Sequence, residues 1–318
     1  MAKVLRCAIF AGMFLLGGGT EALADSTPAP VAQAERLYND GHYKEAIAVL
    51  DAYLKEHPQD ASALVDRGDD YEALNQQQSA ITDYTAAIAI NPQYAYAYAS
   101  RCESYRETDQ GTLALADCDS AISLDPRLAY AYRERALVKL YAKDVNAALA
   151  DANQAVTLAP NSAFGLAVRC RIYVNMANYA SAVDDCTHAL ALNPQSEFAY
   201  FQRGRAEIGQ QRWAPSITDF DKALALDPTE TGAFYWLGLA KYNTADYNGA
   251  LSDADQYIKG EVDDPDGYLL RAQIEVKLGN TIQARASATD ALKHYRIVND
   301  STGAAKAQAL LDSLSTGG

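Results

Sequence analysis

The sequence predicts an all-α solenoid built from about eight helical hairpins. Three observations lead to this prediction. Prolines recur every 34 residues, small residues recur at fixed places between them, and apolar residues follow a helical spacing without a sustained strand alternation. The evenly spaced prolines are Pro58, Pro92, Pro126, Pro160, Pro194 and Pro228.

The prolines mark the connections between hairpins. Each lies in a short segment such as Ile90, Asn91 and Pro92. Proline cannot continue a helix, and it biases the residue before it away from helical geometry, so one helix ends there before another begins. With proline set at position 32, the repeats start near residues 27, 61, 95, 129, 163, 197, 231 and 265.

Small residues at two repeat positions predict a close contact between the helices of each hairpin. Position 8 is alanine, glycine or cysteine in all eight repeats, and position 20 is alanine in seven of them, with Ser216 in the other. Position 27 is alanine in six repeats, whereas position 4 carries bulky residues such as Tyr98 and Phe234. A hairpin of this kind can bury its apolar face only against its neighbours.

This register resembles the tetratricopeptide repeat family over roughly residues 27 to 298, with Tyr71, Tyr105 and Tyr173 as further matches at position 11. The resemblance implies a right-handed superhelical solenoid, and we place the array at residues 25–298. The chain departs from the pattern near the ends of the array, with Pro30 at position 4 and with Val262 and Arg296 where proline is expected. Residues 299–318 are predicted to form a capping helix and tail that shield the last hairpin.

The N-terminus has the layout of a secretory signal peptide. Lys3 and Arg6 precede an apolar stretch over residues 7–16, and small residues at Ala22 and Ala24 precede Asp25. The alternatives are an uncleaved anchor or an apolar start that arose by chance, but the stretch is shorter than the roughly 20 residues of a membrane-spanning helix. We therefore expect residues 1–24 to be removed and the protein to be exported to the periplasm of a bacterium or outside the cell.

Four cysteines occupy positions 8 and 24 of repeats 3 and 5. In a hairpin whose turn lies near positions 15 and 16, these two positions sit at about the same height. An exported compartment permits disulfides, so we expect one within each of the two hairpins. The alternative is that buried cysteines replace small apolar residues in a duplicated repeat. The predicted pairs are Cys102 with Cys118 and Cys170 with Cys186.

A charged series accompanies the repeat. Arginine recurs at position 7 and aspartate at position 23, which indicates repeated ion pairs more than a ladder of ligand contacts. The sequence leaves open whether the pairs form within a repeat or between neighbours. The residues are Arg67, Arg101, Arg135, Arg169, Arg203 and Arg271, with Asp83, Asp117, Asp151, Asp185, Asp219 and Asp253.

The family resemblance also implies a binding surface. In such arrays the first helices line a concave groove, and ligand contacts come mainly from positions 2, 5, 9, 12 and 13. Aromatic residues flanked by arginine suit an extended or helical peptide with apolar and acidic side chains. The alternative is that these aromatics pack between repeats and the arginines form a solvated face. The candidates are Tyr96, Arg106, Tyr130, Arg133, Phe164, Arg171, Phe198, Phe201, Arg205, Tyr235 and Tyr242.

Composition and motifs argue against several other function classes. The net charge of −14 disfavours binding to nucleic acid. The four histidines are scattered over repeats 1, 5 and 8 without metal-ligand spacing, and we find no phosphate-binding loop, nucleophile elbow or dinucleotide fingerprint. We therefore expect no metal, no cofactor, no enzymatic activity and no membrane span in the mature chain.

Two functions remain. The first is a non-catalytic adaptor of the bacterial periplasm or envelope that holds a protein or peptide segment in its groove. The alternative is a carrier or sensor of a non-protein ligand, such as cell-wall glycan, which would use some of the 21 tyrosines as stacking platforms. The sequence identifies neither the partner nor the pathway nor the oligomeric state.

Overall fold

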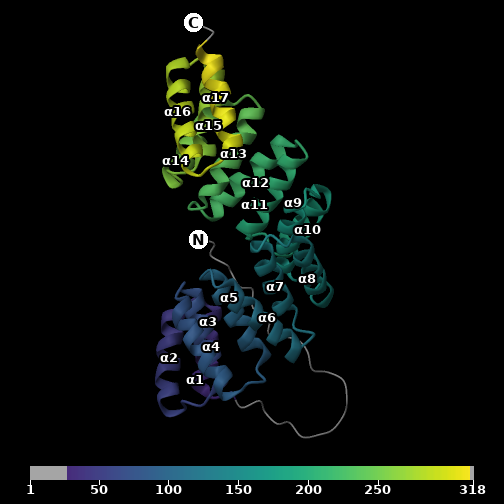
Figure 1. Ribbon diagram of the computed structural model, residues 1–318. Helices are drawn as coiled ribbons and strands as arrows, with labels where there is room; N and C mark the ends of the chain where they lie inside the picture. Colours follow the sequence, from purple (N-terminus) through teal and green to yellow (C-terminus); the bar gives the residue numbers. More distant parts are fainter. Residues whose placement is uncertain (1–26, 316–318) are drawn as a thin grey trace. The chain divides into compact units, whose positions relative to one another are not determined.

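The structure is a computed structural model that describes residues 27–315. The predicted signal peptide lies outside the described residues. Within the described residues the chain forms two compact units, one over residues 27–160 and one over residues 161–315. Every regular element in residues 27–315 is an α-helix, which confirms the predicted fold class (Figure 1).

The first unit contains four helical hairpins. Their helices are α1 (Ala29–Asn39), α2 (Tyr43–Glu56), α3 (Ala61–Ala73), α4 (Gln77–Ile90), α5 (Ala95–Glu107), α6 (Gly111–Leu124), α7 (Ala129–Tyr141) and α8 (Val145–Leu158).

The second unit contains four further hairpins and a terminal helix. These are α9 (Ala163–Asn175), α10 (Tyr179–Leu192), α11 (Glu197–Gly209), α12 (Trp213–Leu226), α13 (Thr231–Asn243), α14 (Tyr247–Gly260), α15 (Pro265–Lys277), α16 (Thr281–Ile297) and α17 (Ser301–Ser315).

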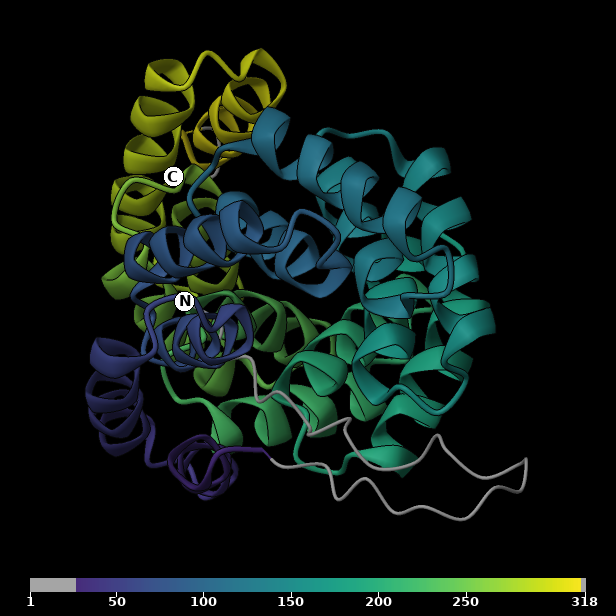
Figure 2. The same cartoon turned by 90° about the horizontal axis from the view of Figure 1, so that it is seen from below.

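Within each unit the hairpins stack in chain order (Figure 2). The odd-numbered first helices pack on one another, as α1 does on α3 and α11 on α13. Among the described residues no even-numbered second helix packs on another second helix. The first helices of a unit therefore form one continuous layer, and side chains on that layer from successive repeats come within reach of one another.

Each hairpin turns at position 15 through a residue with positive φ. Glycine occupies this place in the first and last hairpins, at Gly41 and Gly279. In the six hairpins between them the residue is not glycine, and its φ lies between 55° and 63°. The next amide then bonds back to the helix, as Asn178 N does to Tyr173 O at 2.9 Å. This left-handed C-terminal cap is a common way to end a helix.

The prolines lie in turns started by the residue before them. The side-chain Oδ1 of Asn91 accepts a hydrogen bond from the amide of Gln93 at 3.1 Å, and Asp125 and Asp227 accept in the same way from Arg127 and Thr229, each at 2.9 Å. Asparagine and aspartate favour such turns because the side chain replaces a backbone acceptor. The recurring asparagine or aspartate before proline thus sets the link from one hairpin to the next.

Positions 8 and 24 fill the contact between the two helices of a hairpin with complementary sizes. A Cβ added to Gly68 would lie 2.5 Å from the ring of Tyr84, and one added to Gly204 would lie 2.8 Å from the ring of Phe220. Both rings are fully buried. Glycine at position 8 therefore leaves the space that an aromatic ring at position 24 occupies.

Cysteines occupy the same two positions in the hairpins α5–α6 and α9–α10. Cys102 is bonded to Cys118 with a Cα–Cα distance of 5.5 Å, and Cys170 is bonded to Cys186 with a Cα–Cα distance of 5.6 Å. Both distances fall within the usual range for disulfides. All four cysteines are fully buried.

The arginine–aspartate series forms pairs within each repeat. Five position-7 arginines donate from Nε and Nη2 to both carboxylate oxygens of the position-23 aspartate in the same hairpin, at 2.6–2.9 Å. The third nitrogen reaches the preceding repeat: Arg67 Nη1 lies 2.6 Å from Asp51, and Arg135 Nη1 lies 2.7 Å from Asp119. Each such arginine therefore bridges two repeats as well as two helices.

The series breaks at its end. Asp253 pairs with Lys241 at 2.8 Å because Leu237 stands where arginine is expected. Arg271 turns to Asp255 and Glu275, since position 23 of its repeat is Ser287.

Helix α17 packs on the last hairpin, α15–α16, as predicted for a cap. The buried Gly303 and Ala307 lie on its inner face, and Leu310 and Leu311 join the apolar cluster around Leu292. A long apolar face is thereby covered by a single amphipathic helix. No helix within residues 27–315 combines the length and apolar character needed to cross a membrane.

Candidate partner-binding surface

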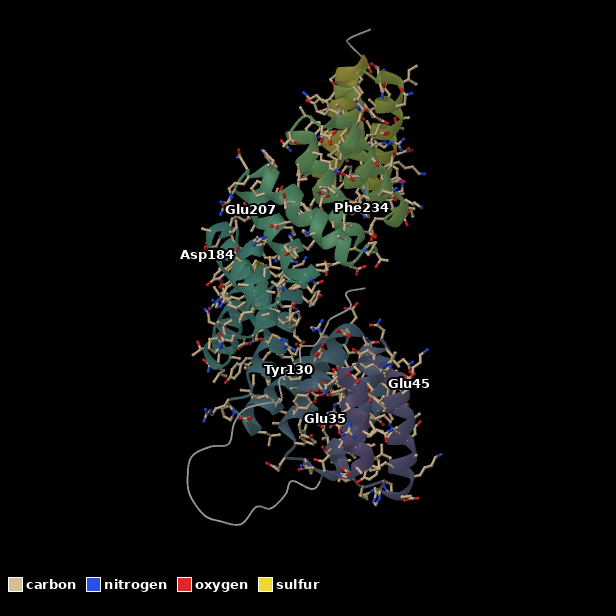
Figure 3. All side chains as sticks on the ribbon, turned by 180° about the vertical axis from the view of Figure 1, so that it is seen from behind. Glu35, Glu45, Tyr130, Asp184, Glu207 and Phe234 are labelled. Atoms are coloured by element: carbon tan, nitrogen blue, oxygen red, sulfur yellow. A yellow bond between two sulfur atoms is a disulfide. The ribbon has the colours of Figure 1, made fainter. Side chains whose placement is uncertain are left out.

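All eleven predicted surface residues lie on first helices, and all are partly buried. They fall into two groups, one in each unit. Tyr96 and Arg106 on α5 and Tyr130 and Arg133 on α7 belong to the first unit; the other seven lie on α9, α11 and α13 of the second. Figure 3 labels Tyr130 on a first helix, whereas the labelled Glu45 and Asp184 are exposed on second helices.

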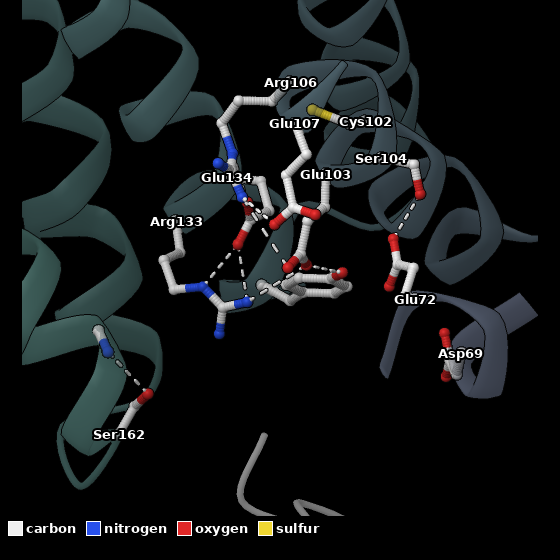
Figure 4. A network of polar contacts seen from close by, with 12 residues as sticks. Asp69, Glu72, Cys102, Glu103, Ser104, Arg106, Glu107, Arg133, Glu134 and Ser162 are labelled. Carbon is white, nitrogen blue, oxygen red and sulfur yellow. Dashed lines mark hydrogen bonds and ion pairs between the residues drawn. The ribbon is translucent and has the colours of Figure 1, made fainter. Parts of the chain in front are cut away.

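The two predicted surface arginines of the first unit, Arg106 and Arg133, both contact a buried carboxylate (Figure 4). Glu134 on α7 has no exposed surface, and its two oxygens accept from Arg133 Nε at 2.8 Å and from Arg106 Nε at 3.2 Å. Glu103 lies 3.9 Å from both arginines. A buried charge of this kind is stable only when paired, so both arginines hold Glu134 in place.

The two tyrosines of this group also have acidic partners. The hydroxyl of Tyr96 donates to Asp69 at 3.0 Å, and the hydroxyl of Tyr130 donates to Glu103 at 2.5 Å. Each bond joins position 2 of one repeat to position 9 of the repeat before it. The ring centroids of the two tyrosines lie 5.5 Å apart, and the Arg133 guanidinium lies 4.6 Å from the ring of Tyr130.

The pKa values of Arg106 and Glu107 reflect the charges that surround them in this network. Burial alone would lower the pKa of Arg106, but Glu134, Glu103 and Glu107 outweigh it and raise the pKa. Burial, followed by Glu103, raises the pKa of Glu107, which also accepts from Gln77 at 2.9 Å. A ligand at this surface would compete with contacts that already satisfy the arginines.

The aromatic residues of the second unit pack mainly on one another. The rings of Phe164 and Phe198 lie 5.8 Å apart, and Tyr242 lies 5.8 Å from Tyr247. Tyr235 contacts Trp236 and Tyr257, each at 5.2 Å. Burial, with Asp266 and Asp264, raises the pKa of Tyr235 to about 12. Ring packing, between repeats for Phe164 and Phe198 and within one hairpin for Tyr235 and Tyr242, therefore accounts for a large part of the aromatic series.

Arg205 on α11 has surroundings unlike those of Arg106 and Arg133. Its guanidinium lies 6.0 Å from the ring of Phe201 and 5.4 Å from the ring of Trp236. Nη1 donates to Gln202 Oε1 at 3.2 Å, but the buried Nε–H has no hydrogen-bond partner. Burial and the neighbouring Arg171 lower the pKa of Arg205. This arginine is held by aromatic rings, without a carboxylate.

An acidic group on α3 was not among the predicted residues. Asp70 is 1% exposed, and its Oδ1 has no hydrogen-bond partner. Burial, Asp69 and Asp66 raise the pKa of Asp70 to about 8. Burial, Asp69, Glu35 and Asp60 raise the pKa of Asp66 to about 7. No periodic pattern marks Asp70, because position 10 is Arg36 in the first repeat and a small or apolar residue in the others. None marks Asp66 either, because no residue type recurs regularly at position 6.

Other features of the described chain lie away from this surface. A shallow depression of about 420 Å³ beside α6 is lined by Tyr98 and Asp119, among others, and includes none of the eleven residues. Within residues 27–315 no three histidine, cysteine or acidic side chains are placed to hold a metal ion. Glu134, Trp236 and Gln202, at position 6, are the partners that sequence reasoning missed.

Comparisons with known proteins agree with the repeat register. A family model described as tetratricopeptide repeat matches residues 31–95. None of the curated proteins matches the chain. A chain of the APC/C hetero-tetramer Cut9–Hcn1 is similar in structure, with a TM-score of 0.74, 13% identity, and coverage of 90% of this chain and 55% of that one. This chain thus spans about half the length of that neighbour.

Two further solved structures are also similar in fold. Pseudomonas aeruginosa pilF has a TM-score of 0.58 at 18% identity, covering 68% of this chain and 96% of its own. PilW, a type IV pilus biogenesis factor, has a TM-score of 0.59 at 22% identity, covering 67% and 97%. With the eight hairpins in a 34-residue register, these matches show that the chain has the fold of tetratricopeptide repeat proteins, and residues 31–95 match the model of that family.

Proposed function

We propose that this protein is a non-catalytic scaffold of the bacterial periplasm or envelope that binds a peptide or protein segment on its first helices. The observation that carries the proposal is the layer of first helices, which brings half-buried aromatic and arginine side chains of successive repeats together. Proteins of this fold serve as interaction scaffolds, and one structural neighbour, PilW, is a type IV pilus biogenesis factor.

The surface also favours a peptide over a glycan. Tyrosines that stack on a sugar need an exposed ring face, whereas most of the tyrosines near this surface are half-buried. The hydroxyls of Tyr96, Tyr130 and Tyr84 donate to carboxylates of the chain itself. Apolar edges beside arginine suit a segment with mixed apolar and acidic side chains.

Affinity capture from envelope extract tests the proposal. Phe198→Ala and Tyr242→Ala each remove a half-buried ring from a first helix of the second unit. Leu192→Ala and Leu226→Ala are matched controls, since both leucines are exposed on second helices of the same unit. We expect a partner that the controls retain and the first-helix variants lose, with all four variants folded by circular dichroism.

Two other outcomes would overturn the proposal. A partner retained by all four variants would place binding on a different surface. Binding to purified cell-wall fragments, with no protein captured, would favour the glycan carrier. Export is tested separately: the protein recovered from the periplasmic fraction should begin at Asp25 by N-terminal sequencing.

A further inference from the structure

The two units differ in what faces position 9 of a first helix. In the first unit an acid at position 9 accepts from a tyrosine at position 2 of the next repeat, as Asp69 does from Tyr96. In the second unit position 9 is arginine, at Arg171 and Arg205, and position 2 has lost its hydroxyl. In this register Phe198 faces Arg171, and Gly232 faces Arg205.

Gly232 has no side chain at position 2, so in this register no ring from that position covers Arg205. A Cβ added there would lie 3.6 Å from the edge of the Phe201 ring, the same ring that contacts Arg205. The nearest atom to that Cβ would be Glu230 Oε1 at 3.0 Å, so a carboxylate of the chain lies beside Gly232, but none of the ion pairs within residues 27–315 joins Glu230 to Arg205. Tyrosine or phenylalanine, the residues at position 2 of repeats 3 to 6, would cover the ring and the guanidinium.

The guanidinium of Arg205 is short of an acceptor. Its Nε–H is buried and makes no hydrogen bond, and Gln202 supplies the one acceptor that Nη1 contacts. Leaving a buried donor unsatisfied is unfavourable, most of all on a charged group. Arg171 places a second positive charge near Arg205 and, after burial, lowers its pKa.

We propose that Arg205 binds a carboxylate of the partner segment beside Gly232, where position 2 has no side chain. Arg171 adds positive charge nearby, and the rings of Phe201 and Trp236 flank the guanidinium. A guanidinium offers paired N–H groups that match a carboxylate, and the two rings suit the apolar part of the same ligand. The carboxylate belongs to an aspartate or glutamate side chain or to a peptide C-terminus. This inference rests on the proposed peptide-binding role of the first helices.

NMR of the arginine Nε–H groups in the ¹⁵N-labelled full chain tests the site directly. The probes are acetyl-Phe-Glu-amide, with a side-chain carboxylate, acetyl-Phe-Gln with a free C-terminus, and the neutral acetyl-Phe-Gln-amide. Arg205→Lys identifies the Arg205 resonance by its loss. We expect that resonance to shift and saturate with at least one carboxylate probe, with a dissociation constant on the order of 1 mM, and not with the neutral probe. Which probe saturates identifies the source of the carboxylate.

Arg106 supplies an internal reference, because its Nε–H already donates to Glu134. Equal shifts of the Arg106 and Arg205 resonances would mean unspecific ionic attraction and would overturn the site. So would the absence of saturation up to about 20 mM of either carboxylate probe.

Two variants test the geometry. Gly232→Tyr should weaken binding of the probe about tenfold or more by covering the space beside Gly232, and Arg205→Gln should weaken it to a similar extent. Lys222→Gln removes the same charge from an exposed site on α12 and should leave the affinity unchanged. If Gly232→Tyr binds as tightly as the unchanged chain, the space beside Gly232 is not the site.

The outcomes separate this inference from the proposed function. If Phe198→Ala abolishes partner capture while neither carboxylate probe binds, the carboxylate site is wrong and the binding surface stands. If a carboxylate probe binds at Arg205 while capture is insensitive to Phe198→Ala, the site stands and the proposed docking surface is wrong.

Discussion

Asp70 should make the stability of the first unit fall as the pH rises through neutrality. The carboxyl is 1% exposed on α3, lacks a hydrogen-bond partner at Oδ1, and has a pKa raised to about 8 by burial, Asp69 and Asp66. In the unfolded chain its pKa is about 4. Between these values the folded state binds the proton and the unfolded state does not. Folding is therefore favoured at low pH, and the advantage is lost as the pH approaches 8.

The expected magnitude follows from this difference. Each pH unit between about 4 and 8 removes up to about 1.4 kcal/mol of the free energy of unfolding through Asp70 alone. Asp66, with a pKa raised to about 7 by burial and by Asp69, Glu35 and Asp60, acts in the same direction up to that pH. Asp70→Asn removes one of the two titrations. It should therefore be more stabilising at pH 7 than at pH 5 by about 3 kcal/mol.

Urea unfolding followed by circular dichroism at pH 5, 6, 7 and 8 measures this difference. Trp213 and Trp236, the two tryptophans of the chain, lie in the second unit, so their fluorescence identifies its transition. Asp184→Asn, at an exposed position on α10, is the matched control and should show no such trend. If Asp70→Asn and the unchanged chain differ by the same amount at pH 5 and pH 7, Asp70 does not titrate near neutrality and the reasoning fails.

Three further predictions concern stability, each measured by urea unfolding. Ala177 has a φ of 55°, a conformation that costs alanine about 1 kcal/mol, so Ala177→Gly should stabilise the second unit by about 1 kcal/mol. As a control, Ala150→Gly at an exposed position on α8 should destabilise the first unit. Gly204→Ala should lower the free energy of unfolding by about 1–3 kcal/mol, because the new Cβ meets Phe220 at 2.8 Å. Adding Phe220→Leu recreates the alanine–leucine pair that Ala34 and Leu50 form in the first hairpin, and it should recover part of the lost stability. If it recovers none, the argument from side-chain size is wrong. Replacing Cys170 and Cys186 together by alanine should cost roughly 3 kcal/mol under oxidising conditions, and an equal stability of variant and unchanged chain would show that the bond contributes nothing.

The fold could be predicted from sequence because its determinants repeat. Proline at position 32 and small residues at positions 8 and 20 each occur so often that the 34-residue period is unambiguous. The positive φ at position 15 escaped prediction, since Lys143, Ala177 and Gln211 are not residues that indicate a left-handed turn. There the stacked hairpins impose a conformation that the local sequence does not favour.

The sequence predicted which helices carry the eleven candidate residues, but it did not predict their contacts. Repeat positions placed the eleven residues on first helices, but contacts between repeats depend on side chains far apart in the chain. Arg67 lies 16 residues from both Asp51 and Asp83, so spacing could not choose between them, and the structure uses both. Glu134 was missed because acids at position 6 follow no period, occurring only as Asp66 and Glu134, although the complete burial of Glu134 determines what Arg106 and Arg133 do.

The two disulfides also set how the chain would respond to mechanical tension. Each one closes a segment between cysteines 16 residues apart inside one hairpin, and neither joins one repeat to another or one unit to the other. Pulling on the two ends of the oxidised chain would separate the hairpins from one another but would not extend the segment enclosed by each disulfide. About 55 Å of contour length would be withheld in each unit until the bond is reduced, at roughly 3.5 Å per residue. An array built this way can be stretched at its joints while two of its hairpins keep their helices together.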